Sequence, residues 1–174
     1  KGFSLLSTVL AGMLVLFVLF GLLSYFSDIL ESKYNIKGFI KGLVIAIPIL
    51  FMSITSYTTG HTLKKIKKYF KISIIVGISL ITIMLITLFF IENLTLYLIF
   101  FFFFCIGTGL VLLSVNTMVT SSCSSNQRGV ITSLYGGARF VGVAIGPPAF
   151  TFFESINKAS MHFYASGITV LIFF

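Results

Sequence analysis

A succession of long apolar runs constrains this chain more than any other feature of its sequence. A helix needs about 20 predominantly apolar residues to cross the hydrocarbon core of a bilayer, and the first five runs reach that length. Of these five, only the fifth carries a charged side chain deep inside it. Six membrane spans are predicted, the last cut short by the end of the sequence: residues 4–26, 42–63, 72–91, 94–119, 130–153 and 161–174.

The composition agrees with this interpretation. Hydrophobic residues make up 57% of the chain and charged residues only 9%, whereas soluble domains carry about 25% charged residues. The mean hydropathy is +1.11. The predicted fold class is therefore an all-α integral membrane protein, built as a six-helix transmembrane bundle.

The positive charge of the chain indicates a membrane partner and no nucleic acid. The net charge is +8, and its densest part is the connection Lys64–Lys71 between two apolar spans. Lysines in such a position are typical of a cytoplasmic loop near anionic lipid headgroups. Lys1 and Arg128 fall on the same side if the spans alternate. We therefore expect a multi-pass protein of the cell membrane whose N-terminus and Lys64–Lys71 loop are cytoplasmic.

The fifth span carries the main candidate residue, Arg139. At about 1.5 Å per residue it lies about 16 Å from Arg128, near the middle of a bilayer core. An arginine at that depth costs roughly 3 kcal/mol or more unless it faces protein or water. At about 100° per residue, one arc holds its polar and glycine face: Arg128, Thr132, Tyr135, Arg139, Gly142 and Gly146. The opposite arc suits lipid: Val130, Leu134, Val141, Ala144 and Ile145.

Three roles remain open for Arg139, with Tyr135 beside it on the same face. It binds a polar or anionic substrate group, pairs with a carboxylate from elsewhere in the protein, or anchors backbone carbonyls near a helix bend. A local ion pair is disfavoured because every acidic residue of the chain lies at a span end: Asp28, Glu31, Glu92 and Glu154. A structural or gating role is favoured over direct substrate binding.

Other candidates are weaker. Asn116 in the fourth span either makes an interhelical hydrogen bond or lines a cavity. Tyr25 and Asp28 are candidates for the substrate pathway, although a solvated helix end is the favoured interpretation of Asp28. The Gly142-x-x-x-Gly146 spacing predicts close helix packing, and Pro147 after it predicts a bent or broken helix.

Nothing in the sequence indicates an enzyme. The two cysteines provide no disulfide framework, and the two histidines, His61 and His162, lie far apart. Neither Gly-x-Ser-x-Gly nor a pair of metal-ligating histidines occurs, so no catalytic residue, cofactor or metal site is predicted.

Six spans, a lysine-rich loop after the second and a fifth span ending in GxxxGP resemble half of a major facilitator superfamily transporter. The branch that it resembles is the twelve-helix drug:proton antiporters. Gly142, Gly146 and Pro147 are similar to that branch's motif in the fifth and eleventh helices. Gly60 and the lysines after it resemble a degenerate form of the loop motif between the second and third helices of a half.

The departures from these motifs favour the C-terminal half, helices 7–12. Lys64 stands where the loop motif has aspartate, and Lys67 stands where it has glycine. Phe150 and Thr151 replace the paired glycines of the full antiporter motif, and residues 101–104 are phenylalanines where an N-terminal half carries an arginine.

The resemblance implies a secondary active transporter that exports small amphipathic molecules by alternating access, coupled to protons. The implied partners are a small-molecule substrate, the lipid bilayer and the N-terminal half of the same transporter. The alternative is a self-contained six-helix membrane subunit of another transporter, or a channel.

Overall fold

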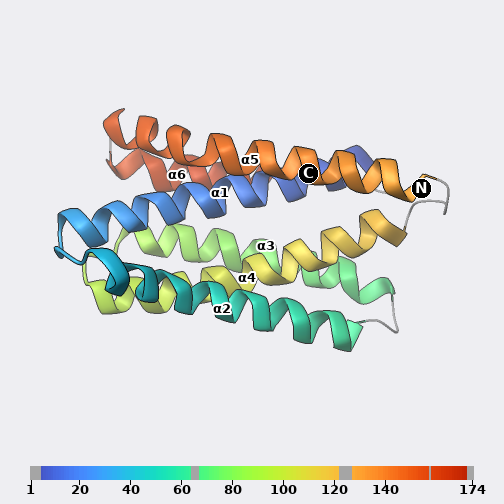
Figure 1. The fold of residues 1–174 in the computed structure, drawn as a ribbon, viewed down its shortest axis with the longest axis horizontal. Coiled ribbons are helices and arrows are strands. Elements are labelled where there is room, and N and C mark those ends of the chain that lie inside the picture. Colours follow the sequence, from blue (N-terminus) through green and yellow to red (C-terminus); the bar gives the residue numbers. More distant parts are fainter. Residues whose placement is uncertain (1–4, 64–66, 122–126, 157, 172–174) are drawn as a thin grey trace.

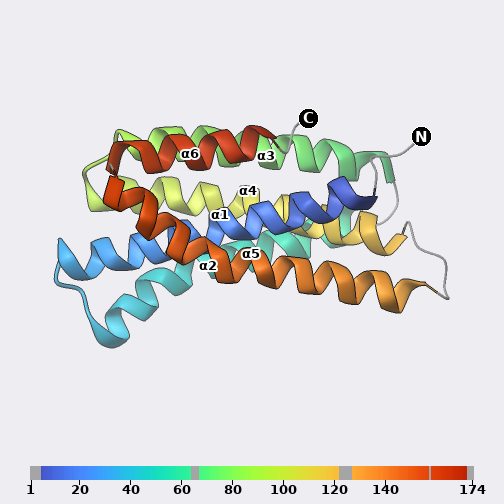
Figure 2. The ribbon, with the colours of Figure 1, turned by 90° about the horizontal axis from the view of Figure 1, so that it is seen from above.

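The computed structural model describes residues 5–63, 67–121, 127–156 and 158–171, and these ranges contain helices but no strand. Consecutive helices run in opposite directions and form one bundle (Figure 1, Figure 2). The all-α class and the six-helix bundle are thereby confirmed, and five of the six helices are long and apolar enough to span a membrane. The helices are α1 (Leu5–Ser32), α2 (Gly38–Leu63), α3 (Lys67–Phe89), α4 (Leu94–Ser121), α5 (Arg128–Ile156) and α6 (Lys158–Leu171).

Most helices extend beyond the apolar spans that the sequence predicts. The first span is predicted to end at Phe26, but α1 continues to Ser32. Its last turn remains helical because backbone hydrogen bonding does not require apolar side chains, and the Ser32 hydroxyl donates to the Asp28 carbonyl oxygen at 2.7 Å. The chain leaves the helix through Asn35, whose φ of 53° is the left-handed conformation common after helix ends.

The two ends of the bundle differ in charge. At one end α3 stops and α4 begins, with Glu92 between them. We refer to this as the acidic end because all four Asp and Glu residues of the chain lie there; Lys33, Lys37 and Lys41 lie there too. At the other end α2 stops and α3 begins, with Lys71 exposed in the first turns of α3; we refer to this as the basic end. Antiparallel packing brings the carboxyl ends of α1 and α5 to the acidic end.

Helices α1 and α4 supply most of the buried core. Helix α1 packs chiefly against α5, and α4 packs against both α3 and α2, so α1, α5 and α6 form one layer beside the layer of α2, α3 and α4 (Figure 1). Aromatic rings join the layers, since Phe26 of α1 stacks on Tyr97 of α4 with ring centroids 5.0 Å apart. The largest fully buried apolar side chains of α1 and α4 are Val15, Leu22, Phe26, Leu30, Phe101 and Phe104.

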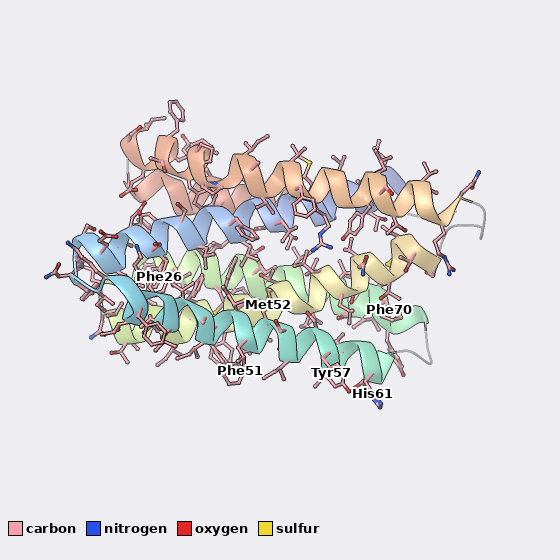
Figure 3. All side chains as sticks on the ribbon, viewed as in Figure 1. Phe26, Phe51, Met52, Tyr57, His61 and Phe70 are labelled. Carbon is pink, nitrogen blue, oxygen red and sulfur yellow. The ribbon has the colours of Figure 1, made fainter. Side chains whose placement is uncertain are left out.

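Helix α2 is attached to the bundle along one narrow face. Figure 3 shows Tyr57 and His61 pointing away from the other helices, and the Tyr57 side chain is 75% exposed. On the inner face, the Ser56 hydroxyl donates to the carbonyl oxygen of Gly109 at 3.1 Å. A Cβ atom on Gly109 would lie 2.7 Å from the Met52 carbonyl oxygen, so the two backbones meet there.

The two prolines of the fifth helix do not break it. Helix α5 continues through Pro147 and Pro148 to Ile156, and the Thr151 hydroxyl donates to the Pro147 carbonyl oxygen at 3.1 Å. Figure 2 shows the last part of the helix turned toward α6. Of the two expected alternatives, a bent or a broken helix, the structure has the bent one, because the lost backbone donors interrupt the hydrogen-bond ladder only locally.

Candidate functional site on the fifth helix

Glycines from both helices allow α1 and α5 to lie in direct backbone contact. A Cβ atom on Gly146 would lie 2.6 Å from the Phe17 carbonyl oxygen, and one on Gly142 would overlap the Met13 carbonyl oxygen. Gly21 of α1 in turn makes room for the Phe150 ring of α5. We call the contact through Gly12, Gly21, Gly142 and Gly146 the glycine seam.

The first glycine of the seam, Gly12, is covered by the ring of Tyr135. A Cβ atom on Gly12 would lie 2.7 Å from that ring. The ring is only 2% exposed, and its hydroxyl group has no hydrogen-bond partner among the described residues. Tyr135 is therefore fixed by shape, because a larger residue at position 12 would push it out of its place.

Arg139 lies one turn after Tyr135 and faces the same way. Its guanidinium carbon is 5.3 Å from the centroid of the Tyr135 ring, which is within cation–π range. The side chain is half-buried, and its Nε atom is buried without a hydrogen-bond partner in the described part of the chain. The ring faces the cation, and the Nε–H donor of Arg139 is left without an acceptor among the described residues.

No ion pair between described residues involves Arg139. Of the acidic side chains, Glu31 pairs with Lys41 at 2.8 Å, and Asp28, Glu92 and Glu154 line a pocket at the acidic end. The structure therefore supplies Arg139 with an aromatic neighbour and no carboxylate from the described residues.

The predicted arc of α5 divides into three environments. Tyr135, Gly142 and Gly146 are buried against α1, Arg139 is half-buried, and Arg128 and Thr132 are exposed. The opposite arc is exposed, as a lipid-facing surface requires. Its large members expose between 47% and 73% of their surface: Val130, Leu134, Val141 and Ile145.

Asn116 does not join this group by any hydrogen bond in the described structure. It is half-buried on α4, where its backbone carbonyl oxygen accepts a hydrogen bond from the Thr120 hydroxyl at 2.9 Å. Helices α4 and α5 contact each other far less than α1 and α5 do. Asn116 thus stays a candidate for the substrate pathway by its place on α4 alone.

Tyr25 and Asp28 lie in a different region from Arg139. Both line the pocket at the acidic end, which has a volume of about 340 Å³. Asp28 is 16 residues from Gly12 along α1, so at about 1.5 Å per residue it is about 24 Å from the Tyr135 ring. The candidate residues therefore form two sites, one on the seam and one at the acidic end.

Three further residues line the pocket at the acidic end, and no feature of the sequence marks them as site residues. Glu92 is consistent with a solvated turn, Glu154 with a span end, and Tyr97 with an ordinary aromatic core residue. The only signal that connects them is alternation of the spans, which brings all three to the same end of the bundle.

Two comparisons with known proteins bear on this chain. It matches the Major Facilitator Superfamily over residues 2–147, a range that includes Arg139 and ends at Pro147. It is also 40% identical over 139 residues to the bacillibactin exporter of Bacillus subtilis (strain 168), covering 80% of this chain and 35% of that protein. The chain thus spans about a third of the length of this curated relative. No solved structure matches the chain significantly.

Proposed function

We propose, from the premise that this chain belongs to the Major Facilitator Superfamily, that it forms helices 7–12 of a twelve-helix exporter. This exporter moves small amphipathic molecules out of the cell in exchange for protons, by alternating access. The exporter named among the relatives supports the outward direction of transport. A family match to transporters also favours this function over an enzyme or a channel.

Arg139 is the observation that carries the proposal. A half-buried guanidinium without a carboxylate among the described residues is costly in a membrane, so its partner comes from elsewhere. A carboxylate of the N-terminal half, or a polar or anionic group of the cargo, supplies that partner in one state of the cycle. In alternating access a charge that exchanges partners between states couples substrate or proton binding to the rocking motion.

The glycine seam supports a rocking mechanism. Helices whose backbones touch cannot slide past each other without large steric overlap, so α1 and α5 move as one body. Arg139 and Tyr135 are then carried by that body toward or away from the opposite half, and the packing of Tyr135 on Gly12 stays unchanged.

The proposed orientation follows the distribution of lysines. The basic end faces the cytoplasm, with the N-terminus on the same side, and the acidic end faces outward. The exposed apolar side chains of α2 and of the outer arc of α5 are available to lipid or to the N-terminal half.

An efflux measurement tests the proposal. Cells that express the full-length gene are loaded with a panel of lipophilic cations, and their retention is compared with that of cells carrying an empty vector, with and without a proton uncoupler. Cells with the exporter should retain less cation than equilibration across the membrane would leave. The uncoupler should abolish the difference in retained cation between these cells and the empty-vector cells. A channel would only allow equilibration. Export that continues undiminished with the uncoupler would contradict proton coupling.

A further inference from the structure

The guanidinium group of Arg139 is only partly enclosed by the protein. None of its nitrogens forms a hydrogen bond or an ion pair with a described residue. Its Nε atom is buried, whereas its two terminal nitrogens, which equally lack a partner among the described residues, are not. These terminal nitrogens carry four of the five N–H donors of the side chain, and those donors are therefore accessible to a ligand.

Open space adjoins the guanidinium group on α5. Gly136 precedes Arg139 by three residues, so it lies beside Arg139 on the surface of the helix. A Cβ atom on Gly136 would meet no atom within 4 Å, and the same holds for Gly137. A guanidinium that opened onto lipid would be costly. In the proposed exporter, the space that Arg139 reaches is therefore the water-filled substrate cavity.

The charge of Arg139 stands alone in the middle of the bundle. It is the only charged side chain of the described helices that lies more than two turns from a helix end. The acidic residue of the same helix, Glu154, is 15 residues further along, or about 22 Å at about 1.5 Å per residue. The middle of this half therefore has a positive potential, which attracts an anion and repels a cation.

The contact with Tyr135 holds this charge in place without neutralising it. The guanidinium carbon lies 5.3 Å from the centroid of the Tyr135 ring, and that ring is packed on Gly12 of α1. The ring supplies no counter-charge. A guanidinium binds a carboxylate through two parallel N–H···O bonds in one plane, and the accessible terminal nitrogens are the donors that this geometry uses.

We propose that Arg139 binds a carboxylate group of the cargo, so that amphipathic molecules with a carboxylate bind more tightly than their neutral or cationic analogues. This inference rests on the proposed function, which supplies the cavity, and deepens it by naming the chemical class of the cargo. The sequence alone favours a structural or gating role for Arg139, whereas the accessible terminal nitrogens favour direct binding.

Binding of radiolabelled 4-phenylbutyrate to the purified full-length protein in detergent tests the proposal. The competitors are 4-phenylbutanamide and 4-phenylbutylamine, which share the apolar body and differ only in the polar group. Binding should be saturable, and the amide and the amine should compete at least about tenfold more weakly than unlabelled 4-phenylbutyrate, because neither accepts two charge-assisted hydrogen bonds. Octanoate, octanamide and octylamine should show the same order, because the carboxylate and not the apolar body sets the preference.

Three variants make the result specific to Arg139. Arg139→Gln should lower the affinity for both carboxylates to that for the amides, and amide binding should stay within about twofold of the wild type, because the amides make no ion pair. Arg139→Lys keeps the charge but loses the planar fork of donors, and it should weaken carboxylate binding at least about fivefold. Arg128→Gln removes an exposed charge of the same helix and should leave the preference unchanged.

The proposal is overturned if neither carboxylate binds saturably, or if the carboxylates bind no more tightly than the amides. The second result is expected if a carboxylate of the N-terminal half is the partner of Arg139. A preference that survives Arg139→Gln, or that Arg128→Gln abolishes equally, would also overturn it. Proton-dependent export by the wild type, measured separately, would leave the proposed function standing in each of these cases. An intact carboxylate preference without proton-dependent export would instead contradict the proposed function alone.

Discussion

Arg139 lies one helical turn after Tyr135 on α5, with its guanidinium carbon 5.3 Å from the centroid of the tyrosine ring. The ring is held by Gly12 of α1, where a Cβ atom would lie only 2.7 Å from it. A glycine on one helix therefore sets the position of a cation on another. This relationship connects the packing of α1 and α5 to the position of the charge that Arg139 carries.

The ring of Tyr135 should matter more than its hydroxyl group. Tyr135→Phe keeps the ring beside Arg139 and removes a hydroxyl that has no hydrogen-bond partner in the described structure, so transport and stability should change little. Tyr135→Leu removes the cation–π contact, worth about 0.5–2 kcal/mol, and should reduce transport. Efflux and thermal unfolding of both variants check this. Equal activity of the Leu variant and the wild type would contradict it.

The glycine seam predicts a contrast between two positions of α5. Gly146→Leu places a side chain where a single Cβ atom would already lie 2.6 Å from the Phe17 carbonyl oxygen, and overpacking of this kind costs about 1–3 kcal/mol or more. Val141→Leu enlarges a side chain that is 47% exposed and should be tolerated. Thermal unfolding in detergent and the amount of folded protein measure the difference. Equal stability of the two variants would refute the packing.

The proposed orientation can be tested with cysteine labelling. Cys123 lies outside the described residues, in the connection between α4 and α5 at the basic end, whereas Cys105 is buried and should not react. In a variant whose other cysteines outside this chain are replaced, a membrane-impermeant maleimide should label Cys123 only after the cells are permeabilised. A cysteine introduced by Glu92→Cys, at the acidic end, should react in intact cells. The reverse pattern would invert the proposed topology.

The apolar spans could be predicted because each is a continuous run whose length matches a bilayer. The helices nevertheless extend into polar residues, as α1 does to Ser32, because backbone hydrogen bonding continues beyond the hydrocarbon region. The exposed outer arc of α5 was also predictable, since helical periodicity alone places Val130 and Leu134 on the side opposite Tyr135.

The tertiary contacts were not predictable in the same way. Gly12 lies in an apolar run where nothing in the sequence pairs it with Tyr135. Glu92 and Glu154 belong to different parts of the chain, and only antiparallel packing brings them into one pocket with Asp28. The prolines left a bent and a broken fifth helix equally open, and only packing on α1 on either side of Pro147, through Gly146 and Phe150, accounts for the continuous helix.

The most direct test of the account is transport by Arg139 variants of the full-length protein, reconstituted in liposomes with an imposed proton gradient. Arg139→Ala removes the charge, and Arg139→Lys keeps the charge but loses the planar fork of donors. Both variants should insert and fold, since Arg139 forms no ion pair with a described residue, and both should lose most of their transport. Wild-type transport by Arg139→Ala would contradict the account.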